Sequence, residues 1–253
     1  MKKILALALT LMLAVTVFAA CGNSTDNAKD DSLVIGYTIY EPMNYFDGET
    51  LTGFDTEFAE AVCEKLGYTP EFVEINWDTK FVTLDSKKID CIWNGMTISD
   101  EVKKNCDVSV AYVKNAQVVV MKEDVIENYK DVDSLKGLKF TAEAGSAGEA
   151  AIIENGLNAN YSPVALQSDA VLAVLGGQAD ACVIDITMAK SMTADGTDYD
   201  SLTYSLELTS EEYGIGFRKG DELTAKVNTA IEELVEDGTL PALAEKYGLN
   251  LAF

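Results

Sequence analysis

The sequence contains no histidine and only one arginine, Arg218. Without histidine, the chain can form neither a Ser-His-Asp or Cys-His nucleophile system nor a His-ligated zinc site. Basic residues are scarce as well, since 19 lysines and arginines stand against 42 aspartates and glutamates, for a net charge of −23. Such a surface repels phosphate backbones, so we expect no nucleic-acid partner.

Hydrophobic residues make up 48% of the 253 positions and charged residues 24%. This balance excludes disordered, collagen-like and coiled-coil chains, and the length suffices for one large or two ordinary domains. After the N-terminal segment no apolar run reaches the length of about 18 residues that a membrane-spanning helix needs. We therefore expect the rest of the chain to fold in water.

The N-terminus has the pattern of a secretory signal, because two lysines precede the apolar run Ile4–Val17 and small residues follow it. The run is too short for a comfortable membrane span of about 20 residues. Ala-Ala-Cys at 19–21 resembles a bacterial lipobox, in which the cysteine is acylated and becomes the mature N-terminus. We expect a lipoprotein signal peptide over 1–20 and an acylated Cys21. The alternative is an ordinary secretory peptide with a chance cysteine.

Residues 21–32 are polar and small, which predicts a flexible tether. Four cysteines follow, and an exported protein could join them in two disulfides. Cys63, however, lies on the apolar side of a helical pattern, and Cys91 and Cys182 lie in apolar strand-like runs, so we expect buried free thiols. These cysteines are Cys63, Cys91, Cys106 and Cys182.

Strand-like and helical segments alternate along the rest of the chain, which predicts an α/β fold with mostly parallel sheets. Apolar or alternating runs predict strands at 33–37, 71–75, 91–93, 117–121, 138–142 and 181–184. Helical periodicity predicts helices at 55–66, 79–87, 148–155, 169–175, 221–235 and 241–247. Gly67 follows the first helix, as a C-terminal cap should.

A weak internal repeat, which we call the internal echo, relates Ser86–Gly95 to Gly176–Asp185 at an offset of 90 residues. Both segments contain a turn, an aspartate and then a buried strand. The internal echo predicts two similarly built lobes. Because ligands bind at the carboxyl ends of strands in open α/β sheets, we expect Gly95 and Asp185 to face one cleft from opposite sides. Coincidence is the alternative.

The chain resembles the extracellular solute-binding proteins of polar amino-acid ABC transporters, the bacterial family-3 group. The motifs that carry the resemblance appear in family order: Leu51–Asp55, Lys88–Asp90 with Gly95–Ile98, Leu135–Gly137, Gly145–Glu149, Asp180–Asp185, Tyr213–Gly220, Asp237–Leu240 and Lys246–Gly248. The family implies a two-lobed, type II periplasmic-binding-protein-like fold with two hinge strands. Lobe 1 would comprise 33–114 and 211–253, and lobe 2 would comprise 115–210.

The resemblance also implies the function. The protein would be the substrate-binding component of an ABC importer, lipid-anchored to the outer face of the cell membrane, which captures an amino acid by lobe closure and delivers it to a permease. It implies a monomer that needs no cofactor or metal and is not an enzyme.

Asp185 matches the acid that contacts the ligand's amino group in similar proteins, and its alternatives are a surface residue or a helix N-cap. The segment Gly95, Met96 and Thr97 matches the one that supplies a backbone carbonyl and a hydroxyl. Ser146 and Ala147 begin a helix, whose N-terminal amides attract anions.

Tyr37, Tyr40 and Trp77 match positions that wall the family's pocket, where aromatic faces attract cations; ordinary core packing is the alternative. Glu41 and Glu143 are further acids that we expect near the cleft.

One departure from the family bears on the ligand. Val102 stands where the family has the arginine that clamps the ligand's carboxylate. Either that carboxylate is held by the amides at 146–148 and a lysine, such as Lys103 or Lys104, or the ligand is a carboxylate-free organic cation such as a polyamine or quaternary amine. A dehydratase-like enzyme, with Glu143 as its acid, is a third hypothesis.

Overall fold

The computed structural model describes residues 31–253. The signal peptide, Cys21 and all but the last two residues of the tether lie outside the described residues. Ser32, which the sequence places at the end of the tether, is already the first residue of a strand.

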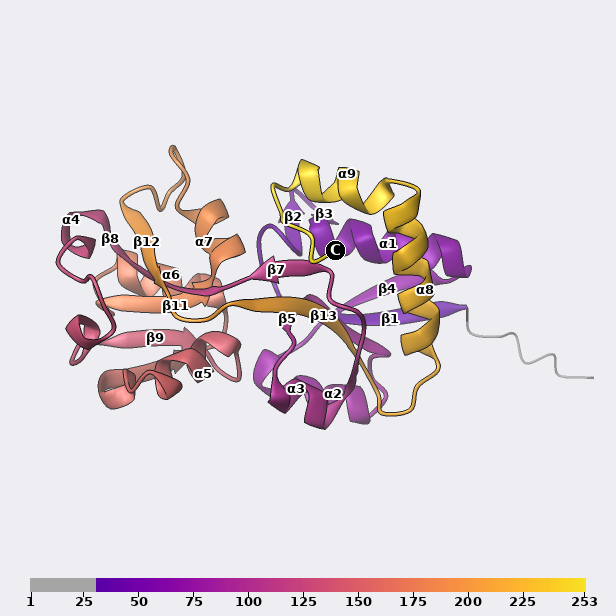
Figure 1. The fold of residues 1–253 in the computed structure, drawn as a ribbon, viewed down its shortest axis with the longest axis horizontal. Coiled ribbons are helices and arrows are strands. Elements are labelled where there is room, and N and C mark those ends of the chain that lie inside the picture. The colour runs from indigo at the N-terminus through magenta and orange to yellow at the C-terminus, as the bar shows by residue number, and fades with distance from the viewer. Residues whose placement is uncertain (1–30) are drawn as a thin grey trace, which may run out of the picture. The chain divides into compact units, whose positions relative to one another are not determined.

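The first sheet has the strand order β4-β1-β5-β13-β6, with β7 also paired to β13 (Figure 1). Its strands are β1 (Ser32–Tyr37), β4 (Thr69–Glu74), β5 (Cys91–Thr97), β6 (Asp107–Val108), β7 (Val113–Asn115) and β13 (Glu211–Phe217). Strand β1 runs parallel to both β4 and β5, whereas β13 runs antiparallel to β5, β6 and β7.

Helices cover both faces of this sheet. They are α1 (Phe54–Leu66), α8 (Leu223–Glu236) and α9 (Thr239–Lys246) on one face, and α2 (Lys80–Asp85) and α3 (Asp100–Asn105) on the other. Successive residues of β5 point to opposite faces, so Trp93 packs in the core under α1 whereas Ile92 packs with residues of α2 and α3. Both residues are fully buried.

The second sheet has the strand order β10-β9-β11-β8-β12. Its strands are β8 (Gln117–Lys122), β9 (Phe140–Glu143), β10 (Tyr161–Val164), β11 (Ala181–Asp185) and β12 (Leu202–Glu207), and α4 (Glu123–Ile126), α5 (Ala147–Glu154), α6 (Gln167–Leu175) and α7 (Ile186–Met192) flank it. Strand β9 is parallel to β10 and β11, whereas β8 is antiparallel to β11 and β12. Each lobe thus has a parallel core joined by antiparallel strands.

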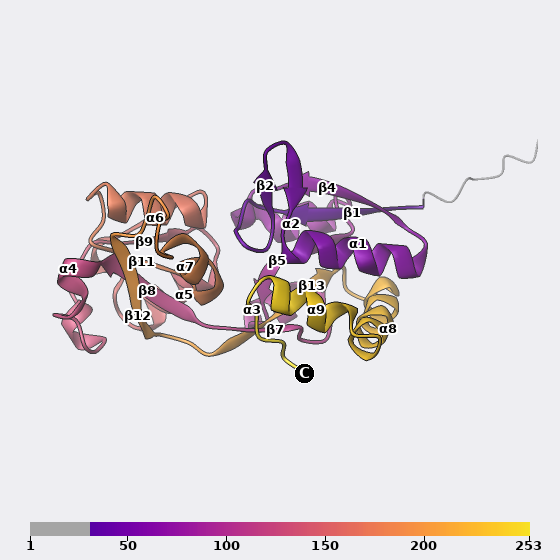
Figure 2. The ribbon, with the colours of Figure 1, turned by 90° about the horizontal axis from the view of Figure 1, so that it is seen from above.

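The chain passes between the lobes twice, from β7 to β8 and from β12 to β13, and the two crossings lie side by side in both views (Figures 1 and 2). Only Ala116 separates β7 from β8. These crossings are the two hinge strands that the family resemblance predicts.

The internal echo is confirmed by equivalent hydrogen bonds. The carboxylate of Asp90 accepts from the amide of Val34 at 3.0 Å, and that of Asp180 accepts from the amide of Lys139 at 2.8 Å. Each aspartate therefore ties the start of its own strand to the start of the neighbouring strand in the same way. The two lobes repeat one construction.

All the predicted helices and strands are present, with shifts of a few residues at their ends. Gly67 caps α1 in the left-handed conformation, with φ 73°. The four cysteines after the tether are buried and free, as expected. The sequence patterns did not predict the strands β2 (Tyr45–Asp47), β3 (Thr50–Thr52), β6, β7, β10, β12 and β13 or the helices α3, α4 and α7. Of these, β2, β3 and β10 are short runs without a buried residue, which carry little periodicity.

Candidate functional site

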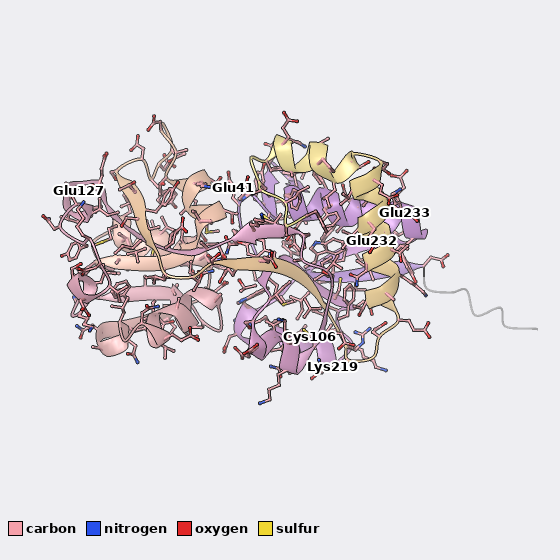
Figure 3. The ribbon with its side chains drawn as sticks, viewed as in Figure 1. Glu41, Cys106, Glu127, Lys219, Glu232 and Glu233 are labelled. Atoms are coloured by element: carbon pink, nitrogen blue, oxygen red, sulfur yellow. The ribbon has the colours of Figure 1, made fainter. Side chains whose placement is uncertain are left out.

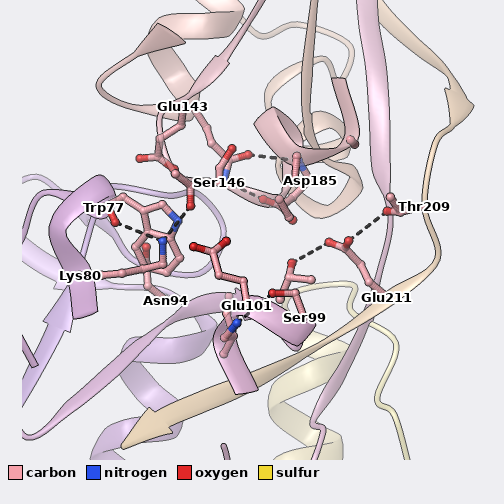
Figure 4. Close-up of a pocket in the computed structure, with 18 of the residues that line it drawn as sticks. Trp77, Lys80, Asn94, Ser99, Glu101, Glu143, Ser146, Asp185, Thr209 and Glu211 are labelled. Carbon is pink, nitrogen blue, oxygen red and sulfur yellow. Dashed lines mark hydrogen bonds between the residues drawn. The ribbon is translucent and has the colours of Figure 1, made fainter. Parts of the chain in front are cut away.

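A cavity of about 140 Å³ lies between the lobes, at the carboxyl ends of β5, β9 and β11 (Figure 4). Residues of both lobes and of the second hinge crossing line it: Trp77, Lys80, Asn94, Gly95, Thr97, Ser99, Glu101, Val102, Glu143, Gly145, Ser146, Ala147, Ala150, Ala151, Glu154, Gln167, Asp185, Thr209 and Glu211. Carboxyl ends of strands are where open α/β sheets bind ligands.

Asp185 ends β11 and is 6% exposed. Its carboxylate accepts hydrogen bonds from the amide side chains of Gln117 at 2.8 Å, Gln167 at 2.7 Å and Asn115. The residue occupies the N-cap position of α7, but its side chain makes no capping bond. The alternative of a surface aspartate is therefore wrong, whereas the N-cap alternative holds for the position of Asp185 but not for its side chain.

Glu211, the first residue of β13, lies next to Asp185 in the same network. Its carboxylate accepts from Thr97 at 2.7 Å, Gln117 at 2.7 Å and Thr209 at 3.0 Å. Burial, followed by the negative charge of Glu211, raises the pKa of Asp185 to about 7, although hydrogen bonds to its carboxylate lower it in part. The sequence analysis missed Glu211; an acid at the start of a hinge strand was the available signal.

Lys80 is the only lysine of residues 31–253 that lines the cavity, and the sequence analysis missed it too. Its side chain is buried, and its ammonium donates to the carbonyl of Gly145 in the other lobe at 2.7 Å and to that of Trp77 at 3.3 Å. The nitrogen also lies 4.8 Å from the centre of the Trp77 ring. Burial lowers its pKa.

Glu143 ends β9 and is 3% exposed. Its Oε1 is buried and has no hydrogen-bond partner among residues 31–253. Burial, followed by the charge of Asp185, raises its pKa to about 8, although the nearby Lys80 lowers it in part. Glu101, in the first turn of α3, points toward the centre of the cavity in Figure 4, with Glu143 above it and Lys80 to its left.

The start of α5 is already capped by its own side chains. The hydroxyl of Ser146 accepts from the amide of Glu149 at 3.1 Å, and the carboxylate of Glu149 accepts from the amide of Gly145 at 2.7 Å. This reciprocal cap places a negative charge at the positive end of the helix. It weakens the attraction of these amides for a ligand carboxylate.

Gly95 brings the backbone of β5 to the cavity wall. Its φ is +56°, and a Cβ there would lie 2.6 Å from Cε1 of Tyr40. Its amide donates to the buried carboxylate of Asp55 at 2.6 Å. Glycine is therefore required by conformation and by space together.

Six of the predicted site residues line the cavity: Trp77, Gly95, Thr97, Ser146, Ala147 and Asp185. Tyr37, Tyr40 and Met96 do not, so the cavity lends no support to their predicted contact with a ligand. Tyr37 meets Phe72 edge to face, and Met96 is buried in the core with α3. Tyr40, for which the resemblance implied the pocket wall and core packing was the alternative, is a core residue, and its hydroxyl contacts Thr187 and the Tyr213 hydroxyl, the latter at 2.5 Å.

Of the further acids, Glu143 lines the cavity whereas Glu41 does not. Glu41 instead accepts a 2.9 Å hydrogen bond from Ser191 of α7 across the gap between the lobes (Figure 3). Val102 lines the cavity, but Lys103 and Lys104 are exposed and are not part of its lining. Neither lysine replaces the missing arginine.

Residues 33–250 match the model of the bacterial extracellular solute-binding proteins, family 3. The chain belongs to this family. It is 33% identical to the arginine-binding extracellular protein ArtP of Bacillus subtilis (strain 168), over 98% of each chain. It is 31% identical to the L-cystine-binding protein TcyJ of Escherichia coli (strain K12), over 96% of this chain and 92% of that one.

A solved structure supports the same membership. The ancestral amino acid-binding protein AncCDT-1, a precursor of cyclohexadienyl dehydratase, matches with a TM-score of 0.80 and 31% identity, over 86% of this chain and 95% of that one. The family-3 solute-binding protein thus has the two-lobed type II fold. None of its helices within residues 31–253 combines the length and apolar character of a membrane span.

Proposed function

We propose that this protein is the extracytoplasmic substrate-binding component of an ABC importer, which captures an amino acid by lobe closure and delivers it to a permease. The observation that supports this best is the buried carboxylate of Asp185 on a cavity lined by both lobes. An ammonium group needs a carboxylate partner when it leaves water. Among relatives, ArtP is named for binding arginine and TcyJ for binding L-cystine.

Closure provides the mechanism. A ligand that contacts Asp185 of one lobe and the Gly95–Thr97 segment of the other gains both sets of contacts only when the lobes are together, so binding shifts the population toward the closed state. The lobes already have contacts that favour this state, including the bond from Lys80 to Gly145 and the contact of Tyr40 with Thr187. The permease would then recognise the closed shape.

The rest of the proposal concerns location and assembly. We propose removal of residues 1–20, acylation of Cys21 and a tether over 21–32 that holds a monomer at the outer face of the membrane. Lobe 1 would comprise 33–114 and 211–253, and lobe 2 would comprise 115–210. The hinges would then fall at the two observed crossings between the sheets.

A carboxylate-free organic cation is the second candidate ligand. The arginine position is occupied by Val102, and the neighbouring Glu101 places a negative charge in the cavity. The one arginine, Arg218, is engaged elsewhere, with the carbonyl of Ile89 at 2.6 Å and the carboxylate of Asp90 at 2.9 Å. A ligand carboxylate would therefore meet no guanidinium in this cavity.

The proposal is tested by a thermal-shift screen of the full-length chain against the common amino acids, polyamines and quaternary amines. We expect a subset of these compounds to raise Tm and to reduce the radius of gyration in small-angle X-ray scattering. Recovery of the bound compound chemically unchanged would support a transport role, whereas its conversion would indicate a dehydratase-like enzyme. Failure of every compound to raise Tm would contradict the proposal.

A further inference from the structure

Four of the carboxylates that line the cavity fall into two groups that differ in their hydrogen bonding. Asp185 and Glu211 lie in a network of donors from Asn115, Gln117, Gln167, Thr97 and Thr209. Glu101 and Glu143 have no such support, because neither side chain takes part in a hydrogen bond or ion pair recorded within residues 31–253. Glu101 is exposed to solvent, whereas Glu143 is buried and lacks the partners that Asp185 and Glu211 have.

The lack of a hydrogen-bond partner is most unfavourable for Glu143, because this residue is buried. It is 3% exposed, lines the cavity and keeps a buried oxygen without a hydrogen-bond partner in the described part of the chain. A buried carboxyl group left without a donor carries a large desolvation penalty. Such a group inside a binding cavity is suited to a donor that arrives with the ligand.

Lys80 does not serve as that donor. Its ammonium is directed to the carbonyls of Gly145 and Trp77, and none of the ion pairs between residues 31 and 253 joins it to Glu101 or Glu143. Among residues 31–253, five acidic residues line the cavity together with this one lysine: Glu101, Glu143, Glu154, Asp185 and Glu211. The imbalance favours a ligand with more than one positive charge.

We propose that Glu101 and Glu143 form a second cation subsite, so that the ligand carries two positively charged nitrogens, one at Asp185 and Glu211 and the other between Glu101 and Glu143. The inference rests on the proposed function and specifies its ligand class. Two kinds of compound share this chemistry: amino acids with a basic side chain, and diamines.

The positions of the two subsites support a short spacing between the nitrogens. Strands β9 and β11 are parallel neighbours, with Phe140 opposite Ala181, so Glu143 and Asp185 lie near the same edge of the sheet. Neighbouring strands are about 4.8 Å apart. Glu101 comes from the other lobe, so a nitrogen held between Glu101 and Glu143 would also draw the lobes together.

Four compounds distinguish the effect of a second nitrogen on affinity from the effect of a carboxylate. L-Lysine and L-norleucine differ in the terminal amino group, and 1,5-diaminopentane and n-pentylamine differ in the same way without a carboxylate. We expect each compound with two nitrogens to bind the full-length chain at least tenfold more tightly than its partner in isothermal titration calorimetry. The order of lysine and 1,5-diaminopentane then identifies which kind of ligand the site prefers. Equal affinities within both pairs would overturn the inference.

The variants Glu143→Gln and Glu101→Gln keep the size of each side chain and remove its charge. Each should reduce the preference for the second nitrogen to less than threefold, whereas the exposed Glu245→Gln should leave it at the parental value. An unchanged preference in both cavity variants would overturn the subsite assignment. Tight binding of neutral amino acids with no gain from a second nitrogen would contradict this inference alone, and no binding of any amine or amino acid would contradict the proposed function as well.

Discussion

Asp185 and Glu211 both accept hydrogen bonds from the side-chain amide of Gln117, at 2.8 and 2.7 Å. Asn115 also donates to both. Two acids from different parts of the chain are thus held side by side by neutral donors, which stabilise their negative charges without neutralising them. A cationic group placed against this pair would supply the missing charge, which supports our proposal that the pair binds a positively charged nitrogen of the ligand.

The variant Asp185→Asn tests this receptor. It keeps the shape of the side chain and removes the charge, so we expect the ligand-induced rise in Tm to disappear, with a loss of affinity of 100-fold or more because a buried charged hydrogen bond is removed, at roughly 2–5 kcal/mol. The exposed Asp195→Asn is the matched control and should bind like the parent. Parental affinity in Asp185→Asn would show that Asp185 is not the partner of the ligand's nitrogen.

The stability of the ligand-free protein should fall as pH rises from 5 to 8.5. Burial raises the pKa of Asp55 and Asp185 to about 7 and that of Glu143 to about 8, so the folded state holds protons that the unfolded state has released above pH 4–5. Glu143 faces the carboxylates of Asp185 and Asp169 and the ammonium of Lys80. Urea unfolding at a series of pH values measures the effect.

The net negative charge of the chain also lowers the stability of the folded state as pH rises. The measurement therefore needs a matched pair of variants. Glu143→Gln removes one buried titrating group and should flatten the pH dependence between pH 6 and 8.5. Glu245→Gln removes the same formal charge from an exposed position and should leave the slope nearly unchanged. Equal slopes in the two variants would assign the pH dependence to the surface charge instead.

Gly95→Ala tests how closely the wall of the cavity is packed. Gly95 and Gly48 both have positive φ, +56° and +62°, but a Cβ at Gly48 meets nothing within 4 Å, whereas one at Gly95 would lie 2.6 Å from Tyr40. Both alanine variants carry the backbone strain, so their difference reports the contact. We expect Gly95→Ala to be less stable than Gly48→Ala by roughly 1–3 kcal/mol in urea unfolding, as for other overpacked cores. Equal stabilities would show that Tyr40 moves away freely.

Val102→Arg tests whether the site lacks only a carboxylate partner. Val102 lines the cavity and is 5% exposed. An arginine there should strengthen the binding of L-norleucine by roughly tenfold, because hydrogen bonds to charged groups contribute about 1.5–3 kcal/mol, part of which is lost to ordering the side chain. Binding of n-pentylamine, which has no carboxylate, should not improve. Calorimetry measures both affinities, with the exposed Val82→Arg as the control.

Weaker binding of L-norleucine to Val102→Arg than to the parent would indicate that the guanidinium pairs with Glu101 instead of the ligand. Improved binding in Val82→Arg would attribute any gain to the change in net charge.

Much of the fold and part of the site could be predicted from the sequence. The periodicities of α1 and β5, the glycine after α1 and the paired Asp90 and Asp180 are local signals, because they depend on neighbours within one segment. Asp185 was identified for the same reason, since its position follows directly from the end of a buried strand.

Only the tertiary structure decided which other side chains reach the cavity. Lys80, Glu101 and Glu211 come from three different elements, α2, α3 and β13, and the sequence around Lys80 and Glu101 does not distinguish them from solvated charges. Tyr40 illustrates the opposite case, because an aromatic residue after a strand was predicted to face the ligand but is buried beside Thr187 and Tyr213. The sequence by itself determined much of the secondary structure, the family and the position of Asp185 at the end of a buried strand. The packing of the two lobes determined the remaining charges, because the direction of a long side chain depends on the surfaces that meet around it.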